Sequence, residues 1–257
     1  MIGKNTTKRI KSLALKKYRQ KEELFLVEGD KNVLEVLHST YQVEQLLATE
    51  NFLSKNSNLT KHAKQITEVT VDEIKKVSLL KNPQNSLAIC ALPVEIPLPE
   101  KLEKDLSLYL DGIQDPGNLG TLIRICDWFG ISQLFCSPDT ANLYNPKVIQ
   151  SSMGSFCRVQ VWYSPFETLL SVTQRQGTPV FGTFLNGKSI YTEKLPSQAL
   201  LVVGNEGNGI RESVGKKIEN KITIPRFTQK YNGAESLNAA VATGIICAEF
   251  IRQQLSA

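Results

Sequence analysis

The sequence predicts an α/β protein in which a parallel-sheet domain follows a smaller α/β domain. After residue 105, near-continuous apolar strands alternate with amphipathic helices, which is typical of a parallel sheet covered on both faces. The segment 92–104 (LPVEIPLPEKLEK) contains three prolines, which disfavour both helix and strand. We therefore predict a first domain at 1–92, a linker at 93–104 and a second domain at 105–257.

The first domain combines apolar strands with a basic N-terminal segment. Helices are expected at 5–20, 30–39 and 71–80, and strands at 23–29, 43–48 and 86–91. Between residues 4 and 21 the chain carries basic side chains and no acidic one: Lys4, Lys8, Arg9, Lys11, Lys16, Lys17, Arg19 and Lys21. Such a block can bind nucleic-acid phosphates through Coulomb attraction and counterion release. From composition alone, a solvated face of a surface helix explains it equally well.

The second domain alternates strands and helices more strongly. Strands are expected at 106–110, 133–137, 158–162, 179–184, 199–204 and 221–225, and helices at 119–129, 146–154, 165–175, 209–217 and 236–253. Ligands of parallel sheets bind beyond the carboxyl ends of the strands. Glycine-rich corners fall at such ends at 111–120, 204–209 and 225–236, so we expect the functional site there.

The bulk composition narrows the class of protein. Of 257 residues, 41% are hydrophobic and 21% charged, which is typical of globular proteins. No apolar run is long enough to span a bilayer, and the basic N-terminus lacks the apolar core of a signal peptide. His38 and His62 are far from the corners, so a histidine triad or zinc site is not expected. A cytoplasmic location is predicted, which fits the scattered cysteines at 90, 126, 136, 157 and 247.

The first corner lies in LDGIQDPGNLGTLIRICDWFGI, residues 110–131. Asn118 stands where a helix cap is expected, and Arg124 lies on the side of the helix opposite its apolar stripe. A helix N-terminus with an asparagine and a fixed cation can hold an anion. The alternative is a capped surface helix with a solvated arginine.

The second corner is VVGNEGNGI, residues 202–210. Its G-x-x-G-x-G spacing differs from the G-x-G-x-x-G of dinucleotide-binding folds, and no P-loop lysine follows. Its glycines permit close approach of backbone to a ligand. Glu206 places a carboxylate inside the turn, although a solvated glutamate at a strand end is the simpler alternative.

The third corner leads into the last helix. Ser236 is expected to cap this helix, and its apolar spacing predicts that Leu237, Val241, Ile245 and Phe250 are buried. Asn238 is polar in the first turn of an otherwise apolar helix, where a buried amide requires a partner.

Taken in order, the three corners resemble a known family. The series N-x-G-x-x-x-R (118–124), V-V-G-N-E-G (202–207) and I-P…S-L-N-x-x-V-A (224–242) is similar to the three motifs of the SpoU/TrmH class of RNA 2′-O-ribose methyltransferases in the SPOUT superfamily. This resemblance extends over 106–252. The N-terminal part, 1–92, with the segment 4–37, resembles the RNA substrate-binding domain, with a ribosomal-protein-like fold, that precedes the catalytic domain in many members.

The resemblance implies a fold, a cofactor and partners. It implies a catalytic domain with a deep C-terminal trefoil knot, an exception to the usual rule of unthreaded chains. It implies S-adenosylmethionine as cofactor, no metal, a homodimer, and RNA as substrate. Ribosomal RNA is favoured because small tRNA enzymes of the family often lack a separate N-terminal domain; a tRNA ribose methyltransferase is the alternative.

The resemblance also implies roles for individual residues. The implied catalytic positions are Asn118, Arg124, Glu206, Ser236 and Asn238. The implied cofactor-binding positions are Val203, Gly204, Asn205, Gly207, Ile224, Pro225, Leu237 and Ala240. Because a ribose hydroxyl is weakly acidic, the reaction requires a base and gains from a nearby cation. Arg124 is either that base or, since guanidinium deprotonation is costly, an electrostatic stabiliser.

The same residues leave two alternatives to a methyltransferase open, and one loop differs in length from that of many relatives. A non-catalytic RNA-binding or assembly protein could share the fold, and a nicotinamide-dependent oxidoreductase is a more distant possibility. The loop 226–235 is longer than in many relatives, and Arg226, Lys230 and Tyr231 are candidate RNA contacts in it.

Overall fold

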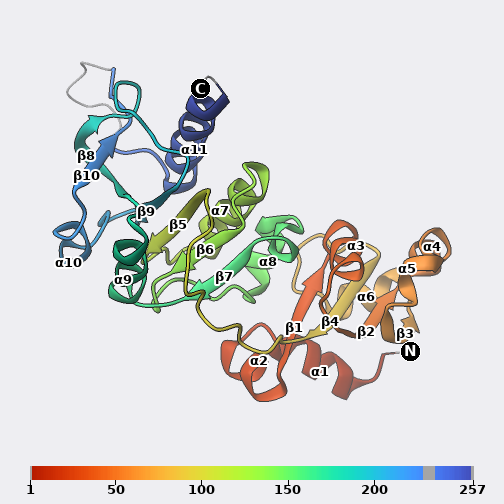
Figure 1. Ribbon diagram of the computed structural model, residues 1–257. Coiled ribbons are helices and arrows are strands. Elements are labelled where there is room, and N and C mark those ends of the chain that lie inside the picture. The colour runs from red at the N-terminus through yellow and green to blue at the C-terminus, as the bar shows by residue number, and fades with distance from the viewer. Residues whose placement is uncertain (1, 228–234, 256–257) are drawn as a thin grey trace. The chain divides into compact units, whose positions relative to one another are not determined.

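The computed structural model describes residues 2–227 and 235–255, and the chain forms two compact units (Figure 1). The N-terminal unit contains residues 1–95 and 142–158, and the catalytic-motif unit contains 96–141 and 159–257. The boundary at 95/96 lies inside the segment that we expect to be a linker. Nothing in the sequence pattern indicated that residues 142–158 would join the N-terminal unit.

The N-terminal unit contains a mixed sheet with the strand order β1-β4-β2-β3. Strand β4 runs antiparallel to β1 and β2, and β3 runs parallel to β2. The mostly exposed strand β3 escaped prediction because its sequence AKQITE lacks a buried apolar face. The elements are α1 (Lys4–Ser12), α2 (Lys16–Glu22), β1 (Leu24–Glu28), α3 (Asp30–His38), β2 (Val43–Ala48), α4 (Glu50–Lys55), α5 (Ser57–Thr60), β3 (Ala63–Glu68), α6 (Val71–Val77), β4 (Ser86–Ala91), α8 (Pro146–Ser152) and the short 3-10 helix η1 (Ser155–Cys157).

The expected helix at 5–20 is two helices joined by a turn. The buried guanidinium of Arg19 donates from Nη1 to the carbonyl oxygens of Leu13 (3.0 Å) and Ala14 (2.9 Å). These carbonyls follow the end of α1, where helix carbonyls lack partners within the helix. Arg19 is therefore a structural residue, in contrast to the exposed lysines around it.

Residues 142–158 complete the core of the N-terminal unit. Phe156 is only 1% exposed, and its ring centroid lies 6.3 Å from that of Phe25 and 5.5 Å from that of Tyr41. The Asn142 side chain accepts a hydrogen bond from Arg19 Nη2 (3.1 Å). This unit is thus built from two separate stretches of chain.

The catalytic-motif unit contains the predicted parallel sheet, with the strand order β10-β8-β9-β5-β6-β7 and parallel pairing between all neighbours. Strands β5 and β9 are adjacent and completely buried, so their carboxyl ends meet at one edge of the sheet. The elements are β5 (Leu106–Asp111), α7 (Pro116–Trp128), β6 (Gln133–Cys136), β7 (Gln160–Tyr163), α9 (Phe166–Gln176), β8 (Val180–Ser189), β9 (Ala199–Gly204), α10 (Glu212–Gly215), β10 (Asn220–Thr223) and α11 (Ala239–Leu255).

Both expected helix caps in this unit are wrong. Helix α7 begins three residues early, and the Asp115 carboxylate accepts a hydrogen bond from the backbone N–H of Asn118 (3.0 Å). Helix α11 is capped by Asn238, whose Oδ1 accepts from the backbone N–H of Ala240 (3.0 Å), and Ser236 is exposed. Because Asp115 caps α7, the Asn118 side chain is available for another partner.

Helices α7 and α11 pack side by side (Figure 1). Exposed apolar side chains lie on these helices and just before α11: Trp128 is 84% exposed, Val241 53% and Leu237 48%. The prediction that Leu237 and Val241 are buried is therefore wrong for the single chain, whereas Phe250 is buried as expected. Within the described residues, we find no helix with both the length and the apolar character needed to traverse a bilayer.

Candidate functional site

The first two corners meet at the carboxyl ends of β5 and β9. The turn 204–210 is closed by two backbone hydrogen bonds between Asn205 and Gly209, of 3.0 and 2.9 Å. Asn205 Oδ1 accepts from the backbone N–H of Gly207 (2.9 Å), and Asn205 Nδ2 donates to the carbonyl oxygen of Gly112 (2.7 Å). Asn205 thus shapes the turn and ties it to the first corner.

One hydrogen-bonded chain joins all three corners. Asn118 Nδ2 donates to Glu206 Oε1 (2.6 Å), and Asn238 Nδ2 donates to Asn118 Oδ1 (3.0 Å). Because an ionised carboxylate only accepts, it fixes the direction of both amides, which leaves Asn238 Oδ1 to cap α11. We call Glu206, Asn118 and Asn238 the Glu–Asn–Asn chain. It brings together three of the five residues expected to be catalytic.

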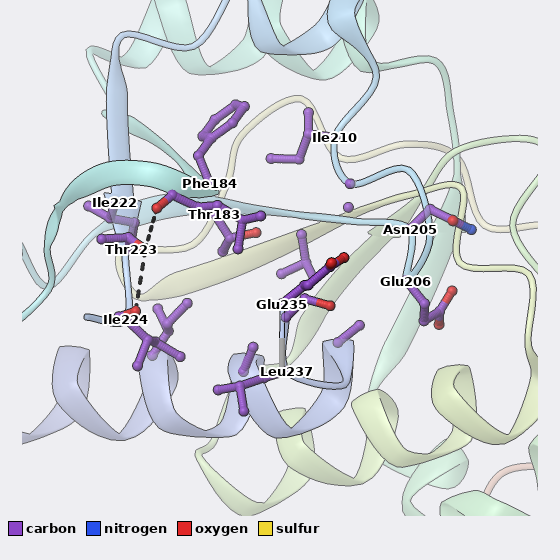
Figure 2. Close-up of a pocket in the computed structure, with 18 of the residues that line it drawn as sticks. Thr183, Phe184, Asn205, Glu206, Ile210, Ile222, Thr223, Ile224, Glu235 and Leu237 are labelled. Carbon is purple, nitrogen blue, oxygen red and sulfur yellow. Dashed lines mark hydrogen bonds between the residues drawn. The ribbon is translucent and has the colours of Figure 1, made fainter. Parts of the chain in front are cut away.

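A cavity of about 650 Å³ lies beside this chain, lined by the second and third corners and by β8. Figure 2 shows Asn205 and Glu206 on one side of the cavity and Ile222, Thr223 and Ile224 on the other. Its size is that of a typical small-molecule site. Ser236 also lines it, as do the expected cofactor positions Val203, Gly204, Asn205, Gly207, Ile224, Pro225 and Leu237.

Ala240 is the exception among the expected cofactor positions. It is buried, but it is not among the lining residues; Ala239, Ala242 and Ile246 form the wall contributed by α11. In a helix, residues 239, 242 and 246 lie on one face, and residue 240 is rotated away from it.

Gly204 allows the turn to fold back closely onto β9. A Cβ atom at this position would lie 2.1 Å from the carbonyl carbon of Gly209 and 2.2 Å from the backbone nitrogen of Ile210. Backbone groups of the turn thereby form the cavity wall directly. A wall of backbone donors and acceptors with apolar side chains opposite suits a ligand that has both polar and apolar parts.

Arg124 is not brought to the cavity within one chain. It is exposed on α7, on the same stripe as Thr121 and Trp128. Within residues 2–227 and 235–255 its side chain makes no hydrogen bond or ion pair. Its expected role at the reacting ribose stays a prediction.

The long loop is only partly described. Arg226 lines the cavity, whereas Lys230 and Tyr231 lie outside the described residues. Sequence reasoning missed Phe184, which lines the cavity from β8, and the pair Asp111–Arg211, which joins the first two corners. An acidic residue that ends the apolar strand LSLYLD was the available signal for that pair.

Comparison with known proteins agrees with this geometry. Residues 105–248 match the model of the SpoU rRNA Methylase family, and residues 4–88 match that of the MRM3-like substrate binding domain. The chain is 32% identical over 238 residues to the 23S rRNA (guanosine(2553)-2′-O)-methyltransferase RlmP of Bacillus subtilis (strain 168), an alignment that covers 92% of each protein.

Two solved structures are similar over nearly the whole chain. One is a protein from Porphyromonas gingivalis assigned to the TrmH family of RNA methyltransferases, with a TM-score of 0.85 and 38% identity over 98% of this chain and 99% of that one. The other is an AdoMet-bound rRNA methyltransferase from Sinorhizobium meliloti, with a TM-score of 0.84 and 26% identity over 98% and 96%. The family match spans the sheet, the cavity and the Glu–Asn–Asn chain, and this protein belongs to the SpoU rRNA methylase family.

Proposed function

We propose that this protein transfers a methyl group from S-adenosylmethionine to a ribose 2′-hydroxyl of RNA, with ribosomal RNA as the substrate. The observation that carries the proposal is the Glu–Asn–Asn chain, which joins polar residues of all three corners beside a cavity that Glu206 itself lines. The similarity to RlmP over nearly the full length of both proteins supports an rRNA substrate.

The cavity residues fit S-adenosylmethionine. When bound, this cofactor supplies a methyl group on a sulfonium, from which a neutral thioether is a good leaving group. Gly204 brings turn backbone to the cavity wall, where N–H and C=O groups can bind the polar parts of a nucleoside. Ile222, Ile224 and Leu237 provide apolar surface that excludes water. We also propose that the C-terminal segment forms the trefoil knot of the family, because residues 222–227, 235–237, 239, 242 and 246 line the same cavity as residues of β8 and β9.

In this proposal the Glu–Asn–Asn chain positions the ribose. The bond from Asn118 occupies Glu206 Oε1, so Oε2 is available to accept a hydrogen bond from the 2′-hydroxyl and to take its proton as general base while that oxygen is methylated. Holding the ribose 2′-oxygen in line with the methyl group raises the rate of methyl transfer, because the entropy of orienting the two groups is lost on binding. Arg124 provides the cation that stabilises the developing alkoxide.

The position of Arg124 leads us to propose a homodimer with cyclic two-fold symmetry. Exposed apolar side chains on neighbouring surface elements mark protein interfaces, and such side chains are Trp128 on α7, Val241 on α11 and Leu237 just before α11. A two-fold contact over these helices would place Arg124 of one chain at the cavity of the other.

Mixing two inactive variants tests this arrangement. In a hybrid dimer of Arg124→Ala and Glu206→Gln chains, one site keeps both native residues if Arg124 acts across the interface. After random exchange, half of the dimers are hybrids with one intact site of two, so about one quarter of wild-type activity should return. No recovery, with subunit exchange verified by mass spectrometry, would show that Arg124 acts in its own chain.

The N-terminal unit is proposed to grip the RNA. Six lysine side chains on α1 and α2 are exposed and available to phosphates, namely Lys4, Lys8, Lys11, Lys16, Lys17 and Lys21. The match of residues 4–88 to a substrate binding domain supports this role. We place the reaction in the cytoplasm, which suits the free cysteines found among the described residues.

The function is tested by mapping ribose methylation in total RNA from cells with and without the gene. We expect one ribosomal mark to be lost on deletion, restored by the wild-type gene and not by Arg124→Ala, which removes the cation. Loss of a tRNA mark instead would identify the alternative substrate. RNA binding by the purified protein without transfer of labelled methyl groups would favour the non-catalytic alternative, and full rescue by Arg124→Ala would remove that residue from its assigned role.

A further inference from the structure

A buried carboxylate ends strand β5, next to the turn that carries Glu206. Asp111, the last residue of β5, is 0% exposed and accepts hydrogen bonds from the backbone N–H (2.8 Å) and Nε (2.7 Å) of Arg211. Arg211 Nη2 donates to the same carboxylate and lies 3.4 Å from Asp139 Oδ1. The fork geometry of a guanidinium suits such multiple bonding, which a lysine ammonium cannot reproduce.

Arg211 stays charged over the ordinary pH range. The hydrogen bond to Asp111 raises the pKa of Arg211 above its usual value, and the neighbouring Asp139 acts in the same direction. A buried carboxylate without a partner is strongly unfavourable, so Arg211 compensates Asp111 in the folded protein. A purely structural role of Arg211 would consist of this charge compensation alone.

The location of the pair points to a second role. Asp111 is the first residue of the first corner and pairs in register with Gly204, and Arg211 stands immediately after the turn 204–210. At the other end of the turn, Asn205 Nδ2 donates to the carbonyl oxygen of Gly112. The turn is therefore attached to the first corner at both ends, and Glu206 lies between the two attachments.

The turn does not need Arg211 to keep its own shape. The Asn205–Gly209 backbone bonds and the Asn205 side chain already close it. The Asp111–Arg211 pair instead fixes the position of that closed turn relative to α7. Helix α7 carries Asn118, whose Nδ2 lies 2.6 Å from Glu206 Oε1. We propose that Asp111 and Arg211 are positioning residues that hold Glu206 in hydrogen-bonding register with Asn118, an inference that rests on the proposed methyl transfer.

The test compares Arg211→Gln, Arg211→Lys and a control, Lys216→Gln. The control breaks an exposed ion pair with Glu212 (2.7 Å) on the adjacent helix α10. Arg211→Gln should lower kcat by about 10²-fold, the size of effect that a displacement of about 1 Å at a reacting group produces, while cofactor affinity measured by calorimetry without RNA stays unchanged. Arg211→Lys should recover part of kcat, and Lys216→Gln should match the wild type.

A crystal structure of Arg211→Gln gives a readout that does not depend on activity. The Asn118 Nδ2 to Glu206 Oε1 distance should lengthen beyond hydrogen-bonding range while the Asn205–Gly209 bonds persist. If the wild type transfers no methyl group, the proposed function fails and this distance alone decides the positioning role. An unchanged distance, an unchanged kcat, or a parallel fall of kcat, cofactor affinity and melting temperature would overturn the proposal.

Discussion

Replacing Gly204 by alanine is expected to abolish measurable cofactor binding and, with it, methyl transfer. The new methyl group would lie 2.1 Å from the carbonyl carbon of Gly209 and 2.2 Å from the nitrogen of Ile210. Both are backbone atoms of the closed turn, so no flexible side chain can move aside to relieve the clash. Gly204 is also held in register with Asp111 in the central strands, so the turn has to move instead.

Displacement of the turn opens one wall of the cavity. Isothermal titration calorimetry with S-adenosylmethionine should show a Kd weakened by at least about 10²-fold, which corresponds to about 3 kcal/mol. Gly244→Ala is the matched control, because a Cβ there lies at an ordinary 3.7 Å from Ile125 Cδ1 within the α7–α11 contact. Binding of the cofactor by Gly204→Ala with wild-type affinity would mean that the turn does not form the cofactor wall.

The sheet and the meeting of the three corners were predictable because both depend on local patterns. Continuous apolar strands indicate a parallel sheet, and glycines at strand ends mark the edge where ligands bind. The helix caps were harder to predict from the sequence. The cap of α7 is Asp115, and the following Pro116 at the first helical position was a usable signal for it. The prediction that Asn118 caps the helix did not anticipate the hydrogen bond that Asn118 Nδ2 makes to Glu206 Oε1.

Features that depend on distant packing could not be predicted from the sequence. Phe156 lies in a segment between two strands of one unit but is buried in the core of the other, and no periodicity encodes that choice. Helical spacing predicted that Leu237 and Val241 are buried, but both are exposed in the single chain, and Leu237 precedes α11. Periodicity identifies an apolar face without identifying what covers it.

The second large effect is expected at Glu206, where exchange of one carboxylate oxygen for an amide nitrogen tests the Glu–Asn–Asn chain. Glu206→Gln preserves size but introduces a donor, so the amide of Asn118 is no longer forced to present Nδ2 to residue 206. If Asn118 flips, its nitrogen faces the nitrogen of Asn238 and the second bond is lost as well. We expect the single-turnover rate constant of methyl transfer, measured at saturating cofactor and RNA, to fall by about 10²-fold, because the ribose loses its alignment.

Two comparisons separate this effect from the loss of a negative charge. Glu212→Gln removes an exposed carboxylate on α10 and should leave kcat unchanged. The double variant Glu206→Gln/Asn118→Ala should be little worse than either single variant, because both changes break the same 2.6 Å hydrogen bond and coupled residues are not additive. If the two losses instead multiplied, each residue would act separately on the substrate. The direction that the carboxylate imposes on both amides would then have no part in positioning the ribose.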